Sequence, residues 1–318
     1  MSIARSVRFA KVFAVLAALA AGMSSCTVPL KNAPPGGGAV VTQTFRLGPF
    51  NLGPNGSSTW QNQGSTTTVP RPSGSFGIKT MTFDLVDANG VPIDRMDVHL
   101  HHVVMMRIGA ADPLCGNTRF GVGVPLSPFA ASGAERTPIM LPDPYTYLVN
   151  STDTWAAAWD VMNMSSSSKQ VYIKYTIGYQ PGATATNSRN VTPYFLDVNG
   201  CRSSDFNVPG NGGPGSVYTK TQTWTAPADG IAVATGGHLH DGGIDITASQ
   251  VTPFGAVGCK SEPTYDGMGM LRSMSGCFDT RQAIIKNGTY QVTARYDNST
   301  ARPAVMGIMM SYVWYGTQ

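Results

Sequence analysis

The chain has 318 residues, a formal net charge of +4 and 13% charged residues; its 36 glycines and 22 prolines favour a turn-rich all-β protein. Three basic residues, Arg5, Arg8 and Lys11, lie in the first 25 positions, where there is no acidic residue, and subtracting them from +4 leaves +1. A nearly neutral remainder excludes the strongly basic surface of a nucleic-acid-binding protein, so we expect no nucleic-acid partner.

Residues 1–25 are predicted to be a signal peptide. The three basic residues are followed by an apolar run at 12–23, which is too short to span a bilayer. Cys26 follows small residues, and this arrangement is typical of a bacterial lipoprotein in which the cysteine is acylated; plain secretion is the alternative. Export to the periplasm or cell envelope is expected in both cases, with membrane contact only through the lipid anchor.

The composition of residues 26–43 indicates a flexible tether, and strand-like runs follow it. The runs at 76–85 and 94–106 flank Asn89-Gly90, a strong hairpin signal. No stretch has sustained helical periodicity, and the polar segment at 180–191 separates two strand-rich regions. We therefore predict two β-sandwich domains in series, at 44–190 and 191–318, each with one histidine run.

Four cysteines remain after Cys26, namely Cys115, Cys201, Cys259 and Cys277. Four cysteines in an exported protein predict two disulfides, and three connectivities are possible. Cys259–Cys277 is the most local pair, and it would leave Cys115 with Cys201. Free structural thiols are the alternative, but they do not suit an oxidising compartment.

All five histidines lie in two short runs: His99, His101 and His102 in the first, His238 and His240 in the second. Imidazole is the commonest transition-metal ligand, and residues at i and i+2 on a strand point to the same side. His99 and His101 should therefore share one face, with His102 on the other. The pattern predicts metal binding, although one histidine of the first run could be purely structural.

Two histidines do not complete a metal site, and the last strand offers Met306, Met309 and Met310. A thioether ligand beside imidazoles favours copper, because soft sulfur suits Cu(I) and tolerates Cu(II). Any one of these methionines could instead simply fill the core.

The two runs and the last strand resemble the type II copper, ascorbate-dependent monooxygenases, the family of peptidylglycine α-hydroxylating monooxygenase and dopamine β-monooxygenase. LHHVVMM (100–106) is similar to the V-H-H-M run of the family's first domain. GGHLHDGG (236–243) is similar to its H-T-H run, and AVMGIMMSYVWY (304–315) to the strand with its ligand methionine. GGHLHDGG is also similar to the proteins called stress up-regulated Nod 19.

The resemblance implies two tandem jelly-roll domains and a copper pair. His101 and His102 would hold an electron-donating copper, with His99 as the spare imidazole, and His238, His240 and Met306 would hold the oxygen-activating copper. The reaction implied is hydroxylation of a C–H bond with dioxygen and an external reductant such as ascorbate. The substrate would be a small molecule or peptide of unknown identity.

Three departures from the family pattern matter. No histidine occurs in 171–179, where the family has a third ligand for its first copper and this chain has Tyr175 or Thr176. Gly236, Ile308 and Met310 stand where the peptide-amidating enzyme anchors its substrate. Asp241 replaces a polar neighbour of the H-x-H run, and we expect it to orient His240 from outside the ligand shell.

Three functions are therefore compared. A secreted copper monooxygenase explains both histidine runs, and a non-catalytic copper-binding lipoprotein for sequestration, delivery or adhesion explains the missing ligand and anchors. One or two copper ions are expected in either case. A zinc hydrolase is the third possibility, because H-x-H-D begins several hydrolase motifs; the chain, however, has no further histidine to complete such a site.

Overall fold

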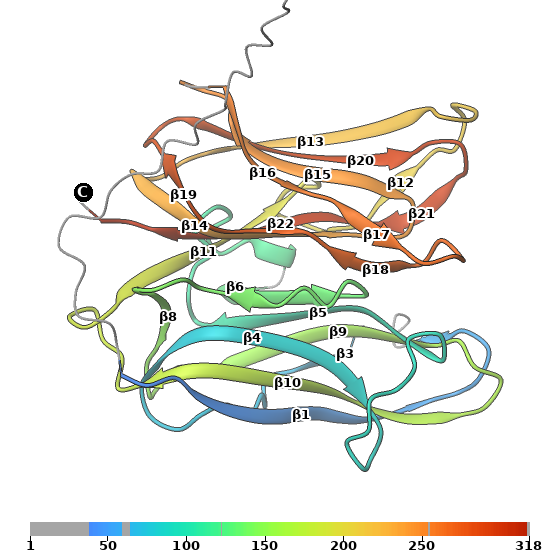
Figure 1. The fold of residues 1–318 in the computed structure, drawn as a ribbon, viewed down its shortest axis with the longest axis horizontal. Coiled ribbons are helices and arrows are strands. Elements are labelled where there is room, and N and C mark those ends of the chain that lie inside the picture. The colour runs from blue at the N-terminus through green and yellow to red at the C-terminus, as the bar shows by residue number, and fades with distance from the viewer. Residues whose placement is uncertain (1–37, 59–63, 122, 254, 317–318) are drawn as a thin grey trace, which may run out of the picture.

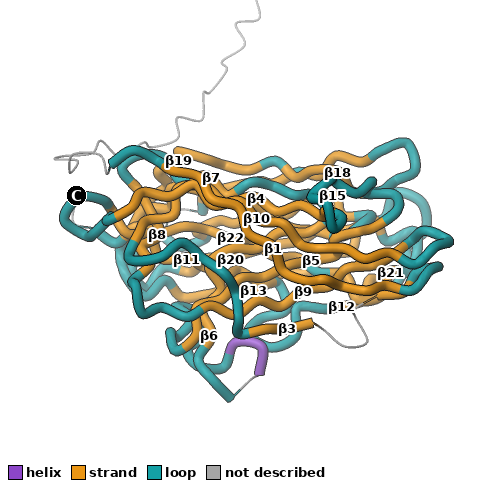
Figure 2. The backbone as a smooth tube through the Cα atoms, turned by 90° about the horizontal axis from the view of Figure 1, so that it is seen from below, coloured by secondary structure: helices purple, strands orange, loops and turns teal. Residues whose placement is uncertain are grey.

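A computed structural model describes residues 38–58, 64–121, 123–253 and 255–316 of the chain. The regular structure of these residues is strand, apart from one 3-10 turn, η2 (Arg119–Gly121), the purple segment in Figure 2. The all-β prediction is thus confirmed. The expected signal peptide and Cys26 lie outside the described residues. Strand β1 begins at Val41, inside the last residues of the expected tether.

Two layers of strands come from the first half of the chain (Figure 1). Alternate residues of their strands are buried, as in the run Val171, Ile173, Tyr175 and Ile177. The outer layer consists of β1 (Val41–Leu52), β10 (Lys169–Pro181), β4 (Phe76–Val86), β7 (Ile139–Met140) and β8 (Tyr145–Val149). The inner layer consists of β2 (Ser57–Ser58), β3 (Gly64–Thr66), β9 (Trp155–Asn163), β5 (Val98–Ile108) and β6 (Leu126–Gly133).

Two further layers come from the second half. The inner one consists of β11 (Arg189–Asp197), β22 (Gly307–Trp314), β14 (Gly230–Leu239) and β19 (Gly276–Ile284). The outer one consists of β13 (Val217–Thr225), β20 (Thr289–Asp297), β15 (Gly243–Gln250) and β16 (Ala256–Ser261). Two short pairs complete the half: β12 (Phe206–Val208) with β21 (Arg302–Val305), and β17 (Pro263–Tyr265) with β18 (Leu271–Met274).

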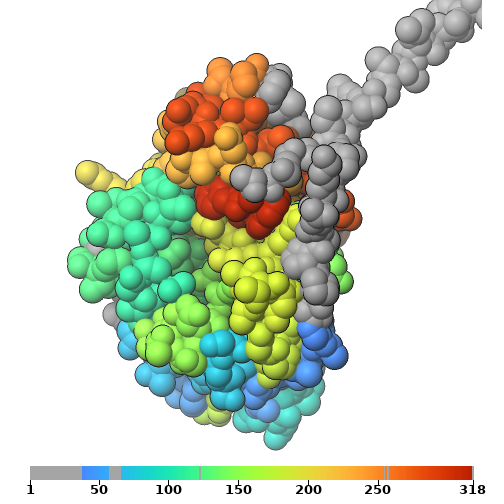
Figure 3. All heavy atoms as spheres, turned by 90° about the vertical axis from the view of Figure 1, so that its left-hand side faces the viewer, coloured from blue at the N-terminus to red at the C-terminus, as the bar shows by residue number. Residues whose placement is uncertain are grey.

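The two halves share one sheet, although each has its own core. Strand β8 pairs in parallel with β11 through Arg189 opposite Tyr145, so a single nine-stranded sheet passes from one half into the other. The expected boundary between residues 190 and 191 therefore falls inside β11. Figure 3 shows the two halves in direct contact on the face that it displays.

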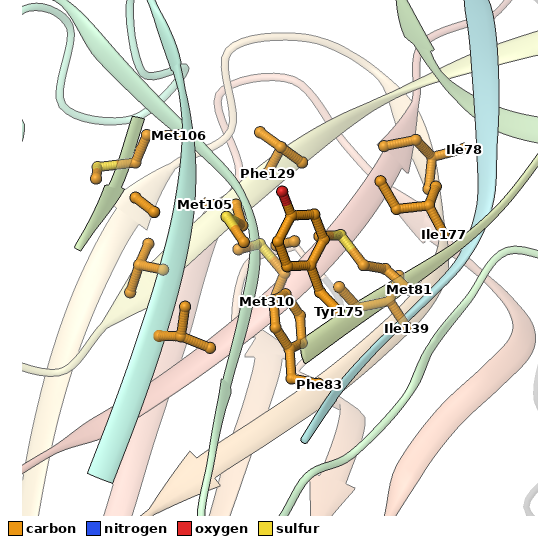
Figure 4. Packing of buried hydrophobic residues seen from close by; sticks show 14 of the residues in the cluster. Ile78, Met81, Phe83, Met105, Met106, Phe129, Ile139, Tyr175, Ile177 and Met310 are labelled. Carbon is orange, nitrogen blue, oxygen red and sulfur yellow. The ribbon is translucent and has the colours of Figure 1, made fainter. Parts of the chain in front are cut away.

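Strand β22 is buried on both faces. Met310 packs into the core of the first half, and Figure 4 shows it beside Tyr175 and Phe83. Met309 points into the second core. The halves thus stack face to face, with β22 and β14 between their two cores.

Both expected disulfides are present. Cys115–Cys201 crosses between the halves over 86 residues, whereas Cys259–Cys277 closes an 18-residue separation inside the second half. Two disulfides indicate that the protein folds in an oxidising compartment. In the part of the chain that is described, no helix is long and apolar enough to cross a membrane.

Candidate metal centre

The first histidine run lies on β5, where the strand contains a bulge. Leu100 pairs with Val161 of β9 and His102 pairs with Asp160, so His101 is an extra residue on the β5 side. The ring centroids of His101 and His102 lie 5.4 Å apart, and those of His99 and His101 lie 6.1 Å apart. As expected from the alternation, His99 and His101 line one cleft, and His102 lines a separate cavity.

The second run lies at the end of β14, which is held between β22 and β19. His238 pairs with Ile308 of β22, and its imidazole packs against Gly133 at the end of β6. A Cβ atom at position 133 would lie 2.5 Å from Cε1 of His238. Only glycine leaves room there, so Gly133 allows the second run to dock on the first half of the chain.

The two runs meet. The ring centroids of His101 and His240 are 4.2 Å apart, and those of His238 and His240 are 5.1 Å apart. His99, His101, His238 and His240 line one cleft of about 460 Å³ between the two halves. The resemblance implies a separate copper for each run, whereas the structure brings both runs to the same place.

Two buried carboxylates contact the histidines. His238 Nδ1 lies 2.9 Å from Glu135 Oε2, while Glu135 Oε1 accepts a hydrogen bond from Gly133 N. His101 Nδ1 lies 3.3 Å from Asp160 Oδ2. Each run therefore has one carboxylate beside one of its imidazoles, the arrangement by which outer-shell residues orient metal ligands.

Neither carboxylate was among the residues predicted from the sequence. Asp160 had a signal, because a lone acid within the apolar strand WAAAWDVMN requires a partner when it is buried. Glu135 had none, since it lies in the loop after β6 and meets His238 only through the contact between the halves.

The contact with Glu135 fixes the tautomer of His238. A carboxylate accepts hydrogen bonds, so the imidazole donates from Nδ1, and in the neutral ring this leaves the lone pair on Nε2. Nε2 of His238 and Nε2 of His240 are both buried and have no hydrogen-bond partner. Buried nitrogens without partners cost free energy, and a bound ligand or metal would recover it.

Burial also favours the neutral form of four imidazoles. Desolvation, followed by the neighbouring histidines, lowers the pKa of His101 to about 2, and desolvation lowers that of His102 to about 3. The pKa of His240 lies well below its usual value and that of His99 is lowered, with desolvation as the main cause in both. Neutral imidazole is the form that binds a metal.

Met306 lies near the second run but outside the cleft. Its buried side chain lines the separate cavity together with His238 and His102. Its carbonyl accepts a hydrogen bond of 2.5 Å from Tyr296 Oη, and Oη in turn accepts one of 2.8 Å from the His240 backbone N–H. The residue that precedes β22 is thus linked to the H-x-H run through the Tyr296 hydroxyl.

Asp241 lines the cleft beside His240. Its Oδ1 accepts a hydrogen bond from Leu271 N, and the expected action on the His240 ring stays a prediction. Tyr175, at the place of the family's third histidine, is fully buried in the first core, where its hydroxyl donates to the Pro70 carbonyl.

Across the described ranges, no group of three or more His, Cys, Asp or Glu side chains is arranged to hold a metal ion as it stands. The imidazoles of the cleft are close in centroid distance, but their grouping is not by itself a metal site.

Comparison with known proteins assigns no family to the chain. No protein-family model matches it, and no curated protein matches it. Among solved structures, the major capsid protein P2 of bacteriophage PM2 is similar, with a TM-score of 0.34, 8% identity, and coverage of 87% of this chain and 99% of that one. A structure of PNGF-II has a TM-score of 0.31 and 10% identity over 80% of this chain and 60% of that one. Likeness at this level says nothing about function.

Proposed function

We propose that the protein is an exported copper-binding protein and that the cleft between its halves is the copper site. The observation that carries the proposal is the contact of His101 with His240, two histidines 139 positions apart in the numbering. It gathers the imidazoles of both runs around one cleft, where two Nε2 atoms lack partners.

The donor set limits the choice of metal. The four described cysteines are in disulfides, so the available ligands are imidazoles, the two carboxylates and a nearby thioether. Imidazoles suit zinc, copper, iron and nickel, and a thioether at the edge of the site shifts the preference toward copper. The choice of copper therefore rests on Met306 and on the resemblance to copper monooxygenases.

The roles of the residues follow from their contacts. His101 and His240 would hold the metal from opposite halves, and Glu135 keeps Nε2 of His238 available as a ligand atom. When bound, copper supplies one-electron redox chemistry. Asp160 lies beside His101 at 3.3 Å and would orient it as a residue outside the ligand shell.

Copper titration of the metal-free protein, followed by EPR, tests the proposal with His101→Ala and His240→Ala. Because the two rings share one cleft, each substitution should weaken binding of the same ion, by more than the 10- to 100-fold typical of outer-shell residues. If each variant lost one ion and bound another as tightly as the parent, the runs would serve separate sites. Unchanged affinity in both variants would rule out the copper proposal, and zinc in preference to copper in the purified protein would favour the hydrolase reading.

Monooxygenase activity is the second candidate, and one observation favours it. An apolar cavity reaches His238 and Met306 and provides room for an organic substrate beside the cleft. Oxygen consumption that requires both copper and ascorbate, and that His240→Ala abolishes, would support catalysis. Tight copper binding without oxygen consumption would leave sequestration, delivery or adhesion.

For the location, we propose lipid attachment at Cys26. The disulfides support an oxidising compartment but do not bear on the anchor. Cys26→Ala should release the protein from membranes into the soluble fraction, and an unchanged membrane fraction would contradict the anchor.

A further inference from the structure

We infer that the cavity next to the copper cleft is a binding site for a small apolar molecule that carries a hydrogen-bond donor. The cavity has a volume of about 870 Å³ and lies between the inner layers of the two halves. The inference does not depend on copper, because the cavity is formed by the folded chain alone.

Small side chains form the floor of the cavity. Val104 occupies the central strand β5, and its direct neighbours across the sheet are Ala131 of β6 and Ala158 of β9. All three line the cavity, and both alanines are only partly buried. Facing sheets pack about 10 Å apart, and larger side chains normally fill the space between them. With an alanine on each side of Val104, this space stays open.

The roof is apolar and comes from the other half of the chain. Met306, directly before β22, Ile308 of β22 and Phe195 of β11 line the cavity. Apolar voids lower stability in proportion to their volume, so an opening of this size has a cost when nothing fills it. Its volume and its apolar lining with a few polar groups are typical of sites for small organic molecules.

Two acceptor atoms in the cavity wall indicate that the ligand should donate a hydrogen bond. His238, of which 8% is exposed, forms part of the wall that the cavity shares with the cleft, and its Nε2 lacks a partner. Asp205 lies at the polar edge with Ser203 and Ser204, and its Oδ1 is buried without a partner. Both atoms can accept, which is why the ligand should donate.

Binding of the neutral fluorescent dye N-phenyl-1-naphthylamine to the metal-free protein tests the inference. The dye is apolar and has one N–H donor, so its emission should rise and shift to the blue when it enters the cavity. Ala158→Phe places a ring on the floor and should weaken binding at least tenfold. Ala185→Phe makes the same change on an exposed loop and should have no effect.

Circular dichroism and thermal unfolding establish that each variant is folded. If Ala158→Phe does not fold, Ala131→Leu fills less volume from the neighbouring strand and should still weaken binding. Asp205→Asn retains an acceptor oxygen and should bind the dye, whereas Asp205→Leu should bind it more weakly. The inference is overturned if the parent protein does not bind the dye, or if the folded Ala158→Phe or Ala131→Leu variant binds it as tightly as the parent. Because no metal is present, failure of the copper proposal would leave these results unchanged.

Discussion

The two histidine runs are held in different ways. His101 is restrained from within its own half, by Asp160 on the neighbouring strand β9. His238 is restrained across the molecule, by Glu135 from the other half of the chain. The first run could thus form in the first half alone, whereas the second run has its orientation only when the halves are docked. The difference indicates that the candidate copper site depends on the contact between the halves, and this dependence can be tested.

The largest effect should come from the disulfides, since one crosses between the halves and the other does not. Cys115 and Cys201 enclose 86 residues and Cys259 and Cys277 enclose 18. The chain-entropy model assigns about 4.5 kcal/mol to the longer loop and about 3 kcal/mol to the shorter one. Replacing both cysteines of a pair by alanine should lower the free energy of unfolding accordingly, as measured in urea.

Copper affinity distinguishes the two bridges more sharply. Loss of Cys115–Cys201 should weaken copper binding, because that bridge helps to hold the halves together. Loss of Cys259–Cys277, although destabilising, should leave affinity nearly unchanged in the folded protein. The reverse order would show that docking of the halves does not control the site.

The next effect concerns the carboxylates. Glu135→Gln keeps one acceptor oxygen, which the Gly133 N–H occupies, and would therefore turn its amide N–H₂ group toward His238 Nδ1. His238 would then favour the tautomer with hydrogen on Nε2, and Nε2 cannot bind a metal while it carries that hydrogen. Copper affinity should fall by about 10- to 100-fold. Nitrogen NMR shifts of the imidazole report the tautomer directly.

The matched changes are Asp160→Asn and Glu262→Gln. The contact of Asp160 with His101 is longer, 3.3 Å against 2.9 Å, so its loss should weaken copper binding less. Glu262 is exposed and its replacement should have no effect. If Glu135→Gln keeps both the tautomer and the affinity, Glu135 is a structural partner only.

The two carboxylates also show which features of the site could not be predicted from the sequence. Local patterns predicted the β-strands, the two disulfides and the grouping of the histidines as candidate ligands. The meeting of His101 with His240 did not, because it depends on the β8–β11 junction and on the register of β14 against β22, which are contacts between distant segments. The bulge at His101 is likewise a property of pairing with β9. Glu135 could be found only after the halves were placed together.

Acidification should lower the free energy of unfolding, because histidines are buried where the halves meet. Burial lowers the pKa of four of them, so below about pH 6.5 the unfolded chain takes up protons that the folded protein does not, and stability falls. Two aspartates oppose this, since burial raises their pKa values to about 6 and the folded state retains their protons between about pH 6 and pH 4. The groups concerned are His99, His101, His102 and His240, against Asp197 and Asp205.

Four groups against two predict a net loss of stability between pH 6.5 and pH 5, and each proton bound only by the unfolded chain contributes about 1.4 kcal/mol per pH unit. Urea unfolding at several pH values measures it. His102→Gln removes one of the four and should flatten the dependence, while Asp205→Asn should steepen it. Stability that rises on acidification would mean that the histidines are charged in the folded protein.

The smallest effect concerns the thioether, and it compares Met306, which directly precedes β22, with Met309 inside that strand. Met306 points toward the first half and lines the cavity with His238, whereas Met309 is fully buried in the second core. Substitution by leucine nearly conserves volume, so each variant should lose less than about 1.5 kcal/mol of stability. If Met306 approaches the metal from the cavity side of His238, Met306→Leu should reduce Cu(I) affinity several-fold and Cu(II) affinity less, because soft sulfur favours the reduced ion. Met309→Leu should change neither affinity. Equal Cu(I) affinity in the parent and in Met306→Leu would make Met306 a core residue, leaving the imidazoles gathered from the two halves to hold the metal alone.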